Sequence, residues 1–194
     1  MSLVINMSKK ERKLPNIQIL DEKDKRLRMK SEEVTFPLSK EDKQTIKDII
    51  EYLEMSQIDE YIEKYELRAG WGLAYIQIGI PKRIFILVQE VEEGKFEKYV
   101  VINPKIKSMS EEIVYIEEGE GCLSVNRPTT GIVPRHARMT LEAYDENGDL
   151  YTIRVREELA VGFQHELDHL DGILFTDKID PKNPFKNKEK YRAL

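Results

Sequence analysis

The stretch FQHELDHLDG, residues 163–172, constrains this chain most, because it contains the spacing H-E-x-x-H. On a helix, His165 and His169 lie on one face with their Cβ atoms roughly 5–6 Å apart. Two imidazoles placed in this way can bind one metal ion, and Glu166 between them can act as a base on a water that the metal activates. Many unrelated hydrolases use this arrangement, so the third ligand and the bond that is broken must be sought in the rest of the chain.

The two clearest helical patterns lie near the ends of the chain. Apolar residues recur at helical spacing over 157–171, and Gly172 is well placed to terminate that helix. An N-terminal amphipathic helix is predicted over 40–54, where Ser39 and Asp42 form a capping signal. The H-E-x-x-H motif therefore belongs to a C-terminal helix with an apolar face.

Between these helices the pattern changes to that of β-strands. Residues 82–156 contain branched apolar runs and alternating segments, and Asn147-Gly148 is a strong signal for a tight hairpin. The order helix, strands, helix predicts an α+β fold, with antiparallel or mixed β-sheets packed around the C-terminal helix.

The remaining segments are less regular. Residues 1–38 are expected to form an extended arm that packs on the domain, with room for a helical turn. Residues 57–69 fit a short helix or a long ordered loop, which the glycines of 70–72 end. Residues 181–194 form a polar C-terminal tail that we expect to be loosely attached. The length suits one metallohydrolase domain over 1–194.

Composition excludes several classes of function. The formal net charge is −5, which leaves no broad basic surface for DNA, and no apolar run approaches the 18 or so residues that a membrane helix needs. Residues 1–16 lack the apolar core of a signal peptide. Cys122 is the only cysteine, so an internal disulfide is impossible and a reducing, cytoplasmic setting is expected.

The same cysteine is the best candidate for the third ligand. The downstream histidine of the metzincin pattern is absent, since Phe175 takes its place, and the only later glutamate, Glu189, lies in the tail. Three downstream carboxylates remain possible ligands: Asp171, Asp177 and Asp180. Upstream, Cys122 follows two closely spaced glycines that would let the backbone approach a ligand. One thiolate and two imidazoles would leave an open position for water, as catalytic metal sites do. His136 needs no functional interpretation.

Three motifs together resemble those of the peptide deformylases. GWGLAYIQIG (70–79), EGCLS (120–124) and QHELDHLDG (164–172) follow the family patterns G-x-G-φ-A-A-x-Q, E-G-C-φ-S and H-E-x-D-H, in the family's order. That family removes the formyl group from N-formylmethionine on new bacterial and organellar chains. The charged insert before the first motif is similar to that of the longer bacterial subclass.

The resemblance implies a role for each motif residue. Cys122, His165 and His169 would hold the metal, natively Fe²⁺, with Zn²⁺, Ni²⁺ or Co²⁺ as substitutes. Glu166 would carry the proton of the attacking water to the departing amine. The side chain of Gln77 and the backbone N–H of Leu123 would donate hydrogen bonds to the oxyanion.

The resemblance also implies a substrate, an N-formylmethionyl peptide, and the ribosome with its nascent chain as a partner. The substrate backbone of the family pairs with the glycine-rich strand, so Trp71, Gly72 and Gly121 are candidates to flank the peptide. Val161, one helical turn before His165, is a candidate wall of the methionine pocket. Each of these four residues could equally serve only in the core or in a turn.

One residue departs from the family pattern. Tyr75 stands where the first motif has its second alanine. If this segment is a strand, Tyr75 points to the same side as Leu73 and Gln77. The ring must then fill the core, which we favour, or line the pocket.

Two other functions fit the motifs. An H-E-x-x-H endopeptidase with an unusual third ligand would cleave internal peptide bonds and would keep its metal without Cys122. A deformylase-like protein whose pocket is blocked by Tyr75 would bind metal or nascent chains without releasing formate. The presence of Glu166 argues against the second alternative.

Overall fold

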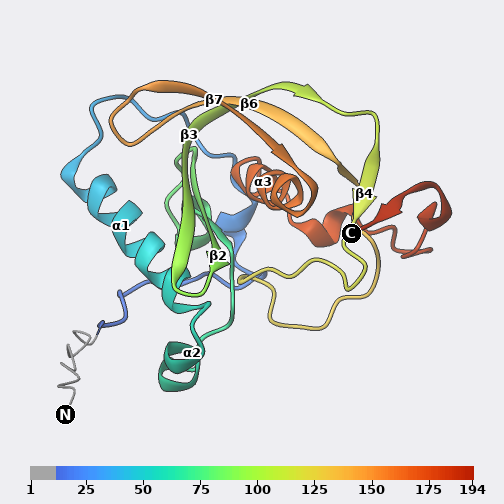
Figure 1. The fold of residues 1–194 in the computed structure, drawn as a ribbon, viewed down its shortest axis with the longest axis horizontal. Coiled ribbons are helices and arrows are strands. Elements are labelled where there is room, and N and C mark those ends of the chain that lie inside the picture. Colours follow the sequence, from blue (N-terminus) through green and yellow to red (C-terminus); the bar gives the residue numbers. More distant parts are fainter. Residues whose placement is uncertain (1–11) are drawn as a thin grey trace, which may run out of the picture.

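The computed structural model describes residues 12–194 and contains two sheets (Figure 1). The larger sheet is antiparallel and has the strand order β1-β2-β3-β6-β7. Its strands are β1 (Gly72–Ala74), β2 (Ile84–Glu92), β3 (Lys95–Met109), β6 (Arg138–Tyr144) and β7 (Leu150–Arg156). The smaller sheet consists of β5 (Arg135–His136), β4 (Ile113–Tyr115) and β8 (Arg192–Ala193), in that order.

Helix α3 (Glu157–Leu170) lies inside the curve of the larger sheet, below β6 and β7 in Figure 1. Phe163 on α3 is fully buried, and its ring meets that of Phe85 on β2 edge to face with centroids 5.5 Å apart. The same core contains Leu141 of β6 and Leu167 of α3. The predicted α+β fold, with sheets packed around a C-terminal helix that carries the motif histidines, is therefore confirmed.

Helix α1 (Lys40–Met55) covers the other face of the sheet. Ser39 Oγ accepts a hydrogen bond from the Asp42 N–H at 3.0 Å, so the predicted cap is present and the predicted helix over 40–54 is extended by one residue. Ile46 and Ile49 are buried against Ile86 of β2. Alternate residues of β2 therefore face the two helices, as the period of a strand requires.

The connecting segments follow most of the expectations. The segment 57–69 contains a short helix, α2 (Asp59–Tyr65), and the turn before β7 has Gly148 at φ 89°. The described part of the N-terminal arm includes one short 3₁₀ helix, η1 (Lys25–Arg28), and Ile17 packs against the core below α1. Residues 1–11, which contain most of the segment compared with a signal peptide, lie outside the described residues.

The expectation of a loosely attached tail is wrong. Strand β8 pairs in parallel with β4, with Val114 opposite Arg192 and Tyr115 opposite Ala193. The Ile132 N–H also donates to the Pro184 carbonyl at 2.9 Å. Backbone hydrogen bonds hold this segment, and a polar side-chain pattern gives no sign of them.

Candidate active site

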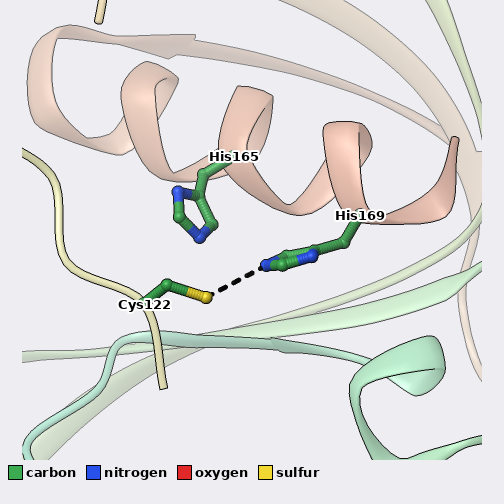
Figure 2. Close-up of side chains that lie close together, drawn as sticks. All are labelled: Cys122, His165 and His169. Atoms are coloured by element: carbon green, nitrogen blue, oxygen red, sulfur yellow. Dashed lines mark hydrogen bonds between the residues drawn. The ribbon is translucent and has the colours of Figure 1, made fainter. Parts of the chain in front are cut away.

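Helix α3 presents both motif histidines to the loop that follows β4 (Figure 2). Cys122 lies in that loop, and its Sγ is 3.3 Å from His169 Nε2. One ligand atom from each of Cys122, His165 and His169 lies within 4.8 Å of the others, and all three residues are buried. This set is the third-ligand arrangement expected from the sequence.

The three downstream carboxylates that were alternative metal ligands are paired with basic side chains instead. Asp171 accepts a hydrogen bond from Arg83 at 2.8 Å, Asp177 is paired with Arg28, and Asp180 is paired with Lys186 at 2.9 Å.

The chemistry of this trio, Cys122, His165 and His169, fits a transition metal. Burial lowers the pKa of His169 well below its usual value, which favours the neutral imidazole that a metal requires. Within residues 12–194, buried Glu166 Oε2 has no hydrogen-bond partner. A thiol and two imidazoles around one small buried space suit Fe²⁺ or Zn²⁺ better than an oxygen-preferring cation such as Mg²⁺.

A buried ion-pair network orients His165. Its Nδ1 lies 2.9 Å from Glu120 Oε2, and Glu120 accepts two hydrogen bonds from Arg135, at 2.7 and 2.9 Å. Arg135 also donates to Asp168 on α3 at 2.5 Å. Burial alone would raise the pKa of Glu120, but the hydrogen bonds from Arg135 and His165 lower it to about 2. The charged carboxylate fixes the tautomer of His165 so that Nε2 is free for a metal.

Glu166 lies on α3 against the first glycine-rich motif. The residue is 4% exposed, and a Cβ added to Gly72 would lie 2.3 Å from Glu166 Oε1. Only glycine at position 72 leaves room for this carboxyl. Burial raises the pKa of Glu166 to about 7. The carboxyl is therefore placed to exchange a proton near neutral pH.

The amide of Gln77 points into the same site. Its Nε2 donates to Ser124 Oγ at 3.2 Å and lies 3.6 Å from Cys122 Sγ, while its Oε1 accepts from the Ala74 N–H at 2.8 Å. These contacts fix the orientation of the amide and leave an N–H beside the metal ligands.

Arg68 fixes the loop that carries Cys122 and Leu123. Its guanidinium donates to the Cys122 carbonyl at 3.0 Å and to the Val125 carbonyl at 3.1 Å. A Cβ added to Gly70 would lie 2.7 Å from Leu123 Cδ1, so the glycine-rich segment and this loop are in close contact.

A cavity of about 490 Å³ opens onto these groups. It is lined by every predicted catalytic residue and by two of the three predicted ligands: Gln77, Leu123, Glu166, Cys122 and His165. The four candidates for substrate binding, Trp71, Gly72, Gly121 and Val161, also line it. His169 lies behind this lining and is almost fully buried. The structure thus brings all ten predicted site residues to one place, and their individual roles stay predictions.

Comparison with known proteins decides the family. The family profile described as polypeptide deformylase matches residues 17–185. The chain belongs to the peptide deformylase family. A peptide deformylase from Oceanobacillus iheyensis is 48% identical over 156 residues, which cover 80% of this chain and 85% of that protein. Peptide deformylase 2 from Bacillus anthracis is 44% identical over 86% of this chain and 91% of its own length.

Solved deformylase structures have the same fold. The enzyme from Legionella pneumophila superposes with a TM-score of 0.69 at 30% identity, over 86% of this chain and 87% of that one. The enzyme from Thermotoga maritima gives a TM-score of 0.64 at 30% identity, over 85% and 98%. Membership of the deformylase family confirms the expectation of a metal-binding hydrolase of protein biosynthesis that removes N-terminal formyl groups. Among the described helices, none is long and apolar enough to cross a membrane.

The residue that departs from the deformylase motif lies in the core. The predicted strand ends at Ala74, and Tyr75 begins a 3₁₀ helix, η2 (Tyr75–Ile78). Tyr75 is 0% exposed, its hydroxyl donates to the Asp42 carbonyl at 2.9 Å, and it packs with Leu73 below α1. The expectation that Tyr75 and Gln77 share a strand face is wrong, because the helical turn directs Gln77 to the metal ligands and Tyr75 to α1.

We expect Tyr75→Ala to destabilise the protein by about 2–5 kcal/mol, because it deletes a fully buried ring. Deformylation per folded molecule should stay within a few-fold of wild type, since the ring does not line the cavity. Denaturant unfolding and kinetics on one preparation test both parts. Tyr75→Phe is the matched control, because it removes only the hydroxyl and should cost about 1 kcal/mol. An alanine variant that melts like wild type and turns over faster would contradict the core assignment.

Proposed function

We propose that this protein hydrolyses the formyl group of N-formylmethionyl peptides and releases formate. The observation that carries the proposal is the cavity in which a Cys/His/His trio, a buried carboxyl and an amide donor meet. We further propose that the chain acts as one metallohydrolase domain in the cytoplasm, on nascent chains at the ribosome.

Cys122, His165 and His169 would hold Fe²⁺, for which Zn²⁺, Ni²⁺ or Co²⁺ can substitute. A metal in this position supplies a Lewis acid that lowers the pKa of water toward neutrality. Glu120 keeps His165 in the tautomer that leaves Nε2 available.

The protein groups around the trio provide the remaining chemistry. Glu166 takes the proton of the attacking water and delivers it to the amine that departs. The Gln77 amide and the Leu123 N–H donate to the oxygen of the formyl group as negative charge develops on it. Arg68 and Ser124 hold these donors in place through the hydrogen bonds described above.

The walls of the cavity are suited to an extended peptide. Gly72 belongs to β1, and Trp71 beside it is 40% exposed. Trp71, Gly72 and Gly121 would flank the peptide backbone, and Val161 would contact the methionine side chain. Apart from the two chain neighbours of Gly121, no atom of the described residues lies within 4 Å of a Cβ added there, so the loop leaves open space.

The decisive measurement is formate release from formyl-Met-Ala-Ser by protein reconstituted with iron under anaerobic conditions. We expect stoichiometric formate and free Met-Ala-Ser. Cleavage of internal peptide bonds would indicate an endopeptidase instead. Bound metal without formate would indicate a binding protein.

Gln77→Leu should lower kcat/KM by about 10²–10³, the scale for losing one oxyanion donor. The effect should appear in kcat, because the donor acts as charge develops. Metal content and the melting temperature must be measured alongside, because Gln77 also accepts from the Ala74 N–H. Ser124→Ala is the matched control, since it removes the partner of Gln77 and keeps the amide. Unchanged kcat in a folded, metal-loaded Leu variant would exclude Gln77 as a donor.

A further inference from the structure

A second cavity lies on the larger sheet and is separate from the active-site cavity. Its volume is about 500 Å³, and it is lined by parts of β3, β6 and β7 that include Arg138, Arg154 and Arg156. The two cavities share no lining residue. In Figure 1, β6 and β7 lie along the upper edge of the molecule, with α3 below them.

Strand pairing brings the polar side chains of this cavity to one face of the sheet. Arg138 of β6 lies opposite Arg156 of β7, and Thr140 lies opposite Arg154. Ser108 of β3 lies opposite Thr140 on its other side. Directly paired residues share a face of a sheet, and so do residues two apart on one strand. The alternate residues of β6 are buried against α3, so the arginines are on the face that points away from that helix.

A β-bulge lies beside the cavity. The register between β3 and β6 shifts between Ile106 and Ser108. A bulge bends its strand and increases the local twist, so a sheet face beside it need not be flat. The bend accounts for a hollow on a face that would otherwise be an open surface.

The positive charge of the cavity is largely uncompensated. Arg154 and Arg156 are exposed, and neither forms a salt bridge with another described residue. Arg138 Nη1 lies 2.6 Å from Glu112, but a guanidinium has further N–H donors. Among the described residues, no carboxylate lines the cavity. Like charges directly opposite each other on paired strands repel, so Arg138 and Arg156 lower the stability of the sheet unless an anion lies between them.

The lining indicates the chemical class of that anion. Arginine donates paired hydrogen bonds to phosphate, and the hydroxyls of Ser108 and Thr140 offer further donors. Arg154 and Arg156 are two residues apart on one strand, a separation of roughly 6.5 Å. A chain of linked phosphoryl groups matches this separation better than a single phosphate. No aromatic side chain of the described residues lines the cavity, so it has no stacking surface for a nucleic acid base.

Acidic residues around the cavity favour a short ligand over a long polyanion. Glu142 lies two residues beyond Thr140 on β6, and Glu157 and Glu158 follow Arg156 at the start of α3. The formal net charge of the whole chain is −5. The backbone of an RNA that crossed this face would pass close to these carboxylates, whereas a ligand within the cavity would not.

We propose that this cavity binds a small ligand that carries two or three linked phosphoryl groups, with Arg154 and Arg156 as its principal contacts. Binding would offset the repulsion between Arg138 and Arg156. Because the two cavities share no lining residue, the ligand would not compete with a formylated peptide for the same groups.

Titration calorimetry of the full chain, loaded with nickel, tests the site with sodium tripolyphosphate as the probe. The test variant is Arg154→Gln combined with Arg156→Gln. The matched control is Lys25→Gln combined with Lys30→Gln, which removes the same charge from two exposed residues that line neither cavity. Metal content is measured before and after each titration, because phosphate chains also bind metal ions.

We expect one tripolyphosphate per chain in wild type and in the lysine control. The arginine variant should bind about 100-fold more weakly or worse, because one charged hydrogen bond is worth about 10–100-fold in affinity. Binding to wild type should weaken as salt is added. Tripolyphosphate should raise the melting temperature of wild type and of the control, but not of the arginine variant.

The properties of the variants without ligand guard against a trivial explanation. The arginine variant should melt no lower than wild type, because it removes a repulsive pair, and both variants should release formate at the wild-type rate. Equal affinity of wild type and the arginine variant for tripolyphosphate would overturn the proposal, and so would the absence of binding to wild type. Equally tight binding of sulfate would overturn the requirement for linked phosphoryl groups. Binding of single-stranded RNA without binding of tripolyphosphate would show a nucleic acid surface instead.

Discussion

Glu166→Ala should keep the bound metal and lose formate release by about 10²–10⁴-fold, the contribution typical of a positioned acid–base group. Glu166 is 4% exposed, and its Oε2 has no hydrogen-bond partner within residues 12–194. Such a buried and unpartnered oxygen costs stability, which fits a carboxyl whose partner is the attacking water. The measurement is kcat/KM for formyl-Met-Ala-Ser together with metal per chain.

The Glu166→Gln variant tests the proton transfer separately from the space that the side chain fills. Glutamine fills the same space against Gly72 and cannot accept the proton of water. We expect it to be as inactive as the alanine variant and to melt at or above the temperature of wild type, because a buried ionisable group is removed. Activity within a few-fold of wild type in the glutamine variant would exclude Glu166 as the base.

The parts of the fold that the sequence predicts are those with local signals. Helix α3 has an apolar periodicity over four turns, and the β6–β7 hairpin has Asn147-Gly148 at its turn. Strand β8 has only two residues, too few for any periodicity, and is held by backbone bonds to a strand almost 80 residues upstream. Helix η2 is also one turn long. The Ala74 N–H before it donates a hydrogen bond to the side chain of Gln77 and not to a neighbouring strand. Such short elements depend on tertiary contacts.

The same distinction holds at the active site. The trio and Glu166 can be predicted because cysteine and histidine are rare in this chain and their spacing has a chemical meaning. Glu120, Arg135 and Arg68 could not be selected, because 35% of the residues are charged and any of them could have been a surface group. Only the structure shows that Arg135 is buried between Glu120 and Asp168. Of these three residues only Glu120 had a sequence signal, because it is the glutamate of the EGCLS motif.

The network around His165 also indicates what the loss of a direct ligand should do. Removing an outer partner of a metal ligand usually lowers metal affinity by about 10–100-fold. Cys122 is itself the proposed ligand, and it is the only cysteine of the metal-ligand grouping found among the described residues, which consists of Cys122, His165 and His169. Removal of the Cys122 thiolate should therefore lower the metal affinity by more than this range.

Cys122→Ala should accordingly leave far less than one metal per chain after purification, and formate release should fall with the metal. The wild-type protein should melt at a lower temperature after chelation, because a metal that binds only the folded state stabilises it. The melting temperature of Cys122→Ala should not respond to the chelator. Ser124→Ala is the control, because Ser124 is fully buried in the same loop and is not a member of the trio. If Cys122→Ala kept full metal occupancy and the chelator response, the thiolate could not be a ligand, and the endopeptidase with a different third ligand would become the better explanation of the H-E-x-x-H helix.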